Sequence, residues 1–245
     1  MYSTSKHVLL GLTTLLLFAI AEITAQPAGN SAYSLITYNV ENLFDADGIA
    51  VFDDYKPEDE DGNPQYTPKD VLTKIQNACQ VLKKYENGEG PDVILFVELE
   101  SDFSHNPGEE RLSLSDFKSQ YANTSLEAML TEDFNAEIKD LPSELLFYKG
   151  MEDTGLTGYD IAVGYSEWDG DGDPANVQKN AIFSRLPINH SKTKRHEIPD
   201  ARTILEVWLE VDGNPLVLFN NHWKSGASSE RMEKIRVRNA RVLDN

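Results

Sequence analysis

Cysteine is almost missing from this sequence: Cys79 is the only one among 245 residues. A single cysteine excludes an intramolecular disulfide, so the fold must depend on its hydrophobic core or on a bound metal. Cys79 lies at helical spacing from Ile75 and Leu82, and no histidine stands near it in the sequence. We therefore interpret Cys79 as a small core residue and not as a nucleophile.

Basic residues are also scarce, with 22 against 41 acidic ones and a formal net charge of -19. Residues 1–178 contain 33 acidic and 10 basic side chains, whereas residues 179–245 contain 8 and 12. A protein that passively coats nucleic acid is basic throughout, so the composition excludes that class. It remains compatible with an enzyme that meets phosphate through a cation and a local basic surface.

Long apolar runs are absent after the first 25 residues. The run at residues 8–21 follows Lys6, is shorter than the roughly 20 residues that cross a bilayer, and precedes small residues up to Ala25. This pattern is typical of a secretory signal peptide, with an uncleaved membrane anchor as the alternative. We expect residues 1–25 to be the signal peptide and residues 26–245 to be secreted or periplasmic, without a membrane anchor after cleavage.

The remaining pattern alternates between strands and helices. Apolar and β-branched runs predict strands at residues 35–38, 91–98, 159–165, 180–188, 202–211 and 215–223, the last two joined by a hairpin. Helices are predicted after the N-cap Thr67, around 125–134 and over 229–243. The acidic stretch 45–66 is typical of a long surface loop. Between 101 and 158 the pattern indicates little else.

Three predicted strands end in polar residues: Asn39, Glu98 and His222. In an α/β sandwich the ligand site lies beyond strand ends, where such side chains can leave the core. Each residue also has a structural interpretation, as a capping amide, a solvated carboxylate or a hydrogen-bonded core histidine. Together they suit a site for a hard cation and phosphate.

Four segments in order, "TYNVENLFD", "PDVILFVELE", "NAIFSRLPI" and "NNHWKS", resemble motifs of the endonuclease/exonuclease/phosphatase superfamily, which includes deoxyribonuclease-like exported nucleases. The resemblance covers most of residues 34–245. It implies an α/β fold, a four-layer sandwich of two packed mixed β-sheets flanked by helices, incomplete at the C-terminus of this chain.

The resemblance also implies roles for the polar residues. Glu98 would bind the catalytic divalent cation, usually Mg²⁺ and alternatively Mn²⁺ or Ca²⁺, and Asn39 would help to hold the metal and the scissile phosphate. His222 would bind phosphate or protonate the leaving oxygen. Asn221 and Lys224 flank His222 and are our candidates for further phosphate contacts.

The chain departs from the family pattern after the histidine. A strand ending in Gly-Asp-x-Asn and a later Ser-Asp-His motif are expected there, and neither occurs before the sequence ends at "RVLDN". We therefore expect a fragment of a longer protein, with little or no activity of its own.

The leading interpretation is an extracellular, metal-dependent nuclease with nucleic acid as its substrate and no implied protein partner. One alternative is a phospholipid or sugar-phosphate phosphodiesterase or phosphatase of the same fold. Another is an exported binding protein without catalysis.

Three further features each have a functional and a structural interpretation. The stretch 168–176, "WDGDGDPAN", alternates aspartates like a calcium loop, although Pro174 stands where such a loop needs glycine. Arg185 and Arg202 could be further phosphate contacts or strand-end charges. A set of basic residues after His222 could form the rim of a phosphate site or a solvated helix face: Lys224, Arg231, Lys234, Arg236, Arg238 and Arg241.

Overall fold

Two β-sheets and six α-helices make up the described part of the chain, which comprises residues 32–106, 109–165, 177–226 and 228–244 of a computed structural model. Tyr33–Asn245 form one compact unit. The predicted signal peptide and the calcium-like stretch 168–176 lie outside the described residues. No helix within those ranges is both long and apolar enough to cross a membrane.

The first sheet is mixed and has the strand order β1-β2-β4-β3, in which β1 and β2 are parallel and the other pairs are antiparallel. The second sheet is antiparallel, in the order β5-β6-β7. The strands are β1 Leu35–Leu43, β2 Val93–Glu100, β3 Asp160–Val163, β4 Gln178–Ser184, β5 Lys194–His196, β6 Ile204–Val211 and β7 Asn214–Asn220.

The helices are α1 Pro68–Leu82, α2 Leu114–Gln120, α3 Leu126–Leu130, α4 Ala136–Lys139, α5 Ser143–Asp153 and α6 Glu230–Leu243. Helix α1 begins as predicted: Thr67 and Asp70 form a reciprocal capping box, and proline occupies the first turn. Ser229 caps α6 by accepting a hydrogen bond from the backbone N–H of Met232.

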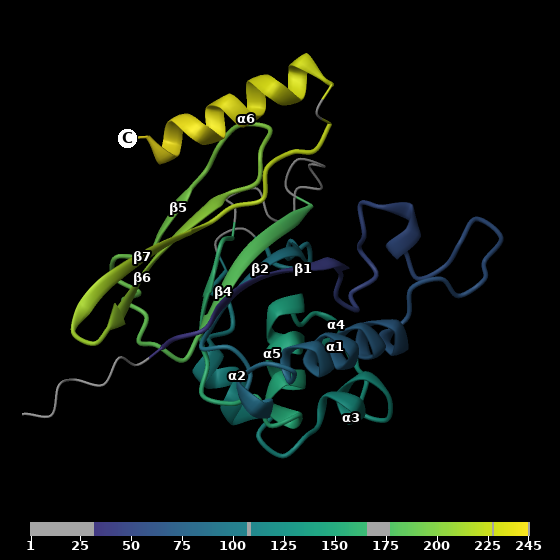
Figure 1. Cartoon of the computed structure of the whole chain (residues 1–245). Helices are drawn as coiled ribbons and strands as arrows, with labels where there is room; N and C mark the ends of the chain where they lie inside the picture. Colours follow the sequence, from purple (N-terminus) through teal and green to yellow (C-terminus); the bar gives the residue numbers. More distant parts are fainter. Residues whose placement is uncertain (1–31, 107–108, 166–176, 227, 245) are drawn as a thin grey trace, which may run out of the picture. The chain divides into compact units, whose positions relative to one another are not determined.

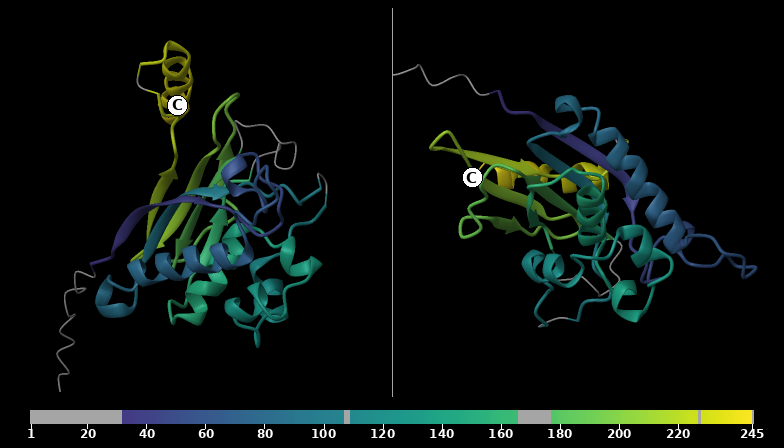
Figure 2. Two further views of the ribbon diagram at one scale, coloured as in Figure 1. Left: turned by 90° about the vertical axis from the view of Figure 1, so that its right-hand side faces the viewer. Right: turned by 90° about the horizontal axis from the view of Figure 1, so that it is seen from below.

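The first sheet separates two hydrophobic cores. Ile94 and Phe96 of β2 pack on the face covered by α1 and α5, whereas Val93 and Leu95 face the second sheet. Figures 1 and 2 show α1–α5 on one side of this sheet and β5–β7 on the other, with α6 beyond the end of the second sheet. The predicted α/β class, with two packed sheets and flanking helices, is therefore confirmed.

The extent of several elements differs from the prediction. Strand β1 continues past Asn39 to Leu43, and β2 continues past Glu98 to Glu100, because each strand contains a register shift that alternation cannot reveal. The helix expected at 125–134 is shorter, because α3 ends at Leu130, and α4, which begins at Ala136, was not predicted. Helix α5, which is buried on most sides, gave no amphipathic signal and was not predicted.

Asn220 joins the end of β7 to the first sheet. Its side-chain Nδ2 donates to the backbone oxygens of Phe96 at 2.8 Å and Ala181 at 3.0 Å. The side chain of Asn180 in turn donates to the backbone oxygens of Asn220, at 3.3 Å, and Thr203, at 3.0 Å. Both amides are buried, so these bonds form where water cannot replace them.

Replacing Asn220 should therefore destabilise the fold. We expect Asn220→Ala to lower the free energy of unfolding by roughly 2–4 kcal/mol, because two buried hydrogen bonds are lost and a cavity remains. Asn220→Asp, which keeps the shape and removes the donor, should cost at least as much. Urea denaturation measures both changes.

The matched control is Asn77→Ala, the same replacement at an exposed position of α1. It should change the free energy of unfolding by less than about 0.5 kcal/mol. Equal stabilities of the Asn77 and Asn220 variants would refute the role assigned to Asn220.

Cys79 provides a second test of the core. Its side chain is fully buried, and burial raises the pKa of its thiol to about 12. Because the thiolate is the reactive form, iodoacetamide at pH 8 should modify the native protein far more slowly than the protein unfolded in guanidinium chloride. Mass spectrometry over time measures both rates, and equal rates would contradict a core position for Cys79.

Candidate functional site

Glu98 and His222 come together from different sheets. The Nε2 atom of His222, two residues beyond β7, lies 3.4 Å from the Oε1 atom of Glu98 on β2. The side chains are 24% and 18% exposed, so a ligand can reach both while most of their surface is held by protein. Two of the three strand-end residues predicted from the sequence are thus neighbours.

A register shift in β2 orients Glu98. Phe96 pairs with Ala181 of β4, and Leu99 pairs with Lys179, so three steps along β2 match two along β4. Leu99 and Phe96 consequently share the helix-covered face, which Glu98 would have occupied in regular alternation. The extra residue directs the carboxylate toward His222 instead.

Glu98 adopts φ of 68°, in the left-handed region that side chains with a Cβ rarely occupy. Such a conformation costs on the order of 1–3 kcal/mol and persists only where the surrounding structure imposes it. Strained residues and β-bulges cluster at functional sites. The backbone therefore supports a functional interpretation of Glu98 that its side chain alone does not.

Asn39 lies in a second register shift, on the neighbouring strand. It pairs with Val97, one residue before Glu98, and it lies on the face opposite to Tyr38 and Val40, which join the helix-side core. Its Oδ1 accepts a hydrogen bond from the N–H of Glu41 at 2.7 Å. Asn39 therefore belongs to the same face of the first sheet as the Glu98–His222 pair, with its amide oxygen engaged by the local turn.

The β1 shift is itself held in place by Lys74 of α1. Glu41 and Asn42 have φ of 52° and 58°, and the Nζ atom of Lys74 donates to their backbone oxygens at 2.7 and 2.8 Å. Gln178 of β4 also donates to the side chain of Asn42. Helix and sheet together fix the bend that follows Asn39.

Positive charge gathers around His222. Arg202 donates from Nη1 to the backbone oxygen of His222 at 3.4 Å. Burial lowers the pKa of His222, and the charges of Arg202 and Lys224 lower it further, while Glu98 opposes them. The imidazole is therefore held toward its neutral form, and its Nδ1 is buried without a hydrogen-bond partner among the described residues.

The other predicted phosphate contacts fall into two groups. Lys224 lies within electrostatic range of His222, whereas the side chain of Asn221 donates to the oxygen of Phe219 at 3.2 Å. The guanidinium of Arg185 instead donates hydrogen bonds to the backbone oxygens of residues 89, 90 and 157. Sequence reasoning left Arg202 and Arg185 equivalent, and the structure separates them.

Three of the five basic residues of α6 form ion pairs with acidic residues. Lys234 pairs with Glu230 at 3.0 Å, Arg236 with Glu233 at 2.7 Å and Arg238 with Asp200 at 3.3 Å. Helix α6 packs its apolar face on residues between β5 and β6. The surroundings of these three residues therefore fit a solvated helix face with ion pairs better than the rim of a phosphate site.

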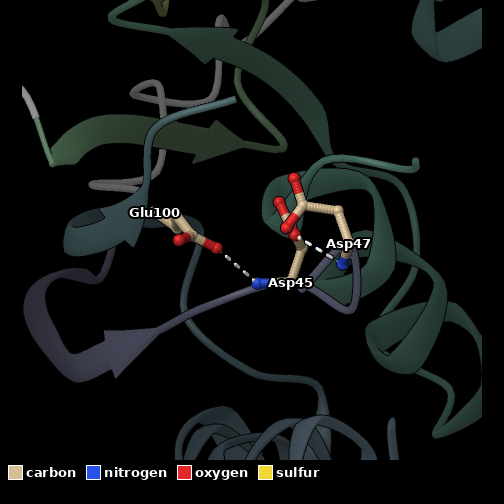
Figure 3. A group of neighbouring side chains, drawn as sticks. All are labelled: Asp45, Asp47 and Glu100. Atoms are coloured by element: carbon tan, nitrogen blue, oxygen red, sulfur yellow. Dashed lines mark hydrogen bonds between the residues drawn. The ribbon is translucent and has the colours of Figure 1, made fainter. Parts of the chain in front are cut away.

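Sequence analysis missed a buried acidic cluster. Asp45, Asp47 and Glu100 each offer a carboxylate oxygen within 4.8 Å of the others, and all three residues are buried (Figure 3). The expected surface loop 45–66 is thus wrong for its first residues. The sequence feature that could have indicated this cluster is the pair of aspartates just after the apolar Leu43 and Phe44. The chain turns there toward the end of β2, where the N–H of Asp45 binds Glu100.

The electrostatics of this cluster are unfavourable as it stands. Burial raises the pKa of Asp45 well above its usual range, and the charges of Glu100 and Asp47 raise it further. Burial likewise raises the pKa of Glu100. A buried carboxylate needs a proton, a positive partner or a metal ion, so the cluster is able to hold a divalent metal.

Comparison with known proteins finds matches among solved structures, at low sequence identity. No protein-family model and no curated protein matches the sequence. Among solved structures, TDP2 from Caenorhabditis elegans is 12% identical with a TM-score of 0.37, over 72% of this chain and 37% of that chain. An endonuclease/exonuclease/phosphatase family protein from Leptotrichia buccalis C-1013-b is 11% identical with a TM-score of 0.41, over 85% and 63%.

The chain therefore spans less than two thirds of the length of either protein. One of the two bears the name of the family that the four sequence motifs resemble. At this similarity no activity or substrate is transferred from them. What the chain does has to be inferred from its own residues.

Proposed function

We propose that the protein hydrolyses phosphodiester bonds with the help of a divalent cation held by Glu98, and that His222 acts on the substrate phosphate. The observation that supports this most is the position of the Glu98 carboxylate, 3.4 Å from the imidazole of His222 at the junction of two sheets. The backbone of Glu98 is strained, with φ of 68°. Neither residue needs this placement for packing, because Phe96 and Leu99 fill the core on either side.

The residues around Glu98 suit a hard cation. Carboxylate and amide oxygens are the ligands that Mg²⁺ and Mn²⁺ prefer, and Asn39 lies on the neighbouring strand. The carboxylate of Glu98 contacts His222 through Oε1 at 3.4 Å and is 18% exposed, so a ligand can reach it. A bound cation would supply charge neutralisation at the phosphate.

His222 suits a hydrogen bond to the substrate phosphate, because a neutral imidazole keeps one N–H donor. Its Nε2 atom faces Glu98 and its ring is partly exposed, so substrate can approach that nitrogen. Arg202, which holds the backbone of His222, and Lys224 both add positive charge beside the ring. Cations at this place would bind phosphate and favour the charge that develops on it.

For the substrate we propose nucleic acid, and for the place of action the exterior or the periplasm. The sequence motifs and the predicted signal peptide support this choice, and the strongly acidic composition makes a bridging cation necessary for a polyanionic substrate. We expect slow turnover by residues 26–245, because the two downstream motifs are missing from them. Binding is therefore a better primary measurement than cleavage.

Removal of the Glu98 carboxylate should abolish cation-dependent binding. We expect a phosphorothioate oligonucleotide to bind more tightly with Mg²⁺ than with EDTA, and Glu98→Gln to reduce this Mg²⁺ effect at least tenfold, because the isosteric amide cannot neutralise a cation. Fluorescence anisotropy measures binding, and nicking of supercoiled plasmid measures any cleavage.

Glu210→Gln makes the same replacement at an exposed strand position and should behave like the wild type. His222→Gln should keep the Mg²⁺ effect on binding but lose residual nicking, whereas His190→Gln, at an exposed histidine, should lose neither. Plasmid nicking that persists in EDTA would contradict the metal assignment. Phosphatase or phospholipid turnover without any DNA binding would move the substrate to the other classes of this fold.

A further inference from the structure

A second cation site is suggested by the buried acidic cluster. Asp45 and Asp47 belong to the loop after β1, and Glu100 is the last residue of β2. Figure 3 shows the three carboxylates gathered in one place. Backbone N–H groups hold one oxygen of each: Asp47 N–H binds Asp45 Oδ1 at 3.1 Å, Ile49 N–H binds Asp47 Oδ1 at 2.6 Å and Asp45 N–H binds Glu100 Oε2 at 2.9 Å.

The second oxygens are without partners. Asp47 Oδ2 and Glu100 Oε1 are buried and accept no hydrogen bond within the described part of the chain. The residues themselves are 3% and 1% exposed, so bulk water does not satisfy these atoms. Buried carboxylate oxygens in this state normally belong to an ion pair or to a metal site.

Neighbouring basic residues do not neutralise the cluster. Lys179 lies within electrostatic range of Asp45 and Glu100, but it already forms an ion pair with Glu144 at 2.8 Å. Lys139 is the one basic residue that lines the adjoining cavity, among the residues described, and it is exposed. Three ionised carboxylates against one lysine leave a charge of -2, which one divalent cation would cancel.

We propose that Asp45, Asp47 and Glu100 bind a hard divalent cation, with Ca²⁺ preferred to Mg²⁺. The donor set is oxygen alone, and the oxygens lie within 4.8 Å of one another, close enough for one cation to contact all three. The adjoining cavity of about 300 Å³ has room for the water ligands that complete a calcium shell. Mg²⁺ demands shorter distances and stricter geometry.

This site is separate from the one proposed for catalysis. The residues that line its cavity include Phe44, Tyr66 and Phe134, and they do not include Asn39, Glu98 or His222. The cation would join the loop after β1 to the end of β2. Its role is therefore to fix the loop and the two shifted strands, and its effect should be on stability.

Thermal unfolding with and without Ca²⁺, at constant ionic strength, tests the proposal. We expect Ca²⁺ at about 100 times its Kd to raise the Tm of the EDTA-treated protein by about 5–10 °C. Glu98→Gln and Asp54→Asn, an exposed aspartate of the same loop, should keep this shift. Asp47→Asn and Glu100→Gln should lose it.

The variants also differ without cation. Asp47→Asn and Glu100→Gln should then have a Tm equal to or above that of the wild type, because each removes an uncompensated buried charge. A cluster that serves only as a hydrogen-bonded network predicts the opposite, a lower Tm and no response to Ca²⁺. A Ca²⁺ shift that survives in Asp47→Asn, or a larger shift with Mg²⁺ than with Ca²⁺, would overturn the assignment.

A second measurement does not depend on the folding of those variants. In Glu98→Gln, Tb³⁺ bound at the cluster should emit when the nearby Tyr66 is excited, and Ca²⁺ should displace one equivalent of it. Failure to observe any sensitised, Ca²⁺-displaceable Tb³⁺ would refute the cluster as a cation site. Because Glu98 is already removed, this result is independent of the proposed function.

Discussion

One extra residue in β2 determines which side chains meet. Alternation along a strand assigns every second residue to one face, and a single insertion reverses the assignment of all residues that follow. Here the change falls between Phe96 and Leu99, so Leu99 enters the helix-side core and Glu98 leaves it. The strained φ of Glu98 is the local cost of that exchange. Without the insertion the carboxylate would be buried among apolar side chains, away from His222.

The same constraint explains why the second sheet is anchored where it is. A carboxylate directed out of β2 forms a site only if a partner is held opposite, and β7 ends there because Asn220 binds backbone oxygens of β2 and β4. His222 follows two residues later, and Arg202, two residues before β6, donates a hydrogen bond to its backbone oxygen. Buried amides that cross between sheets are therefore as necessary to the site as the residues within it.

The sequence predicts element types well and their bends poorly. Periodicity and capping identify α1 with its N-cap Thr67, and the apolar runs identify every strand of the two sheets except the short, polar β5. Glu98 and His222 were predicted as neighbours from their strand-end positions, which does not require knowledge of the bulge. The bulge itself depends on pairing with β4, which is a tertiary contact. Asp45 and Asp47 have the sequence pattern of loop residues, and their burial becomes evident only from the contact with Glu100. Burial of a charge is invisible in composition.

Both acidic features follow from how the two parallel strands end. β1 and β2 run side by side and both shift register at Asn39–Leu43 and Phe96–Leu99, so their last residues are displaced together. Glu98 turns toward the second sheet, and Glu100, two residues later, meets the loop that leaves β1. Carboxylates near the end of a buried strand each need a positive partner, because an ionised carboxylate is unstable in an apolar core. The charge of Arg202 acts on Glu98. At Glu100 the described protein offers the exposed Lys139 and Lys179, which is already paired with Glu144, and this is why a bound cation is the consistent solution there.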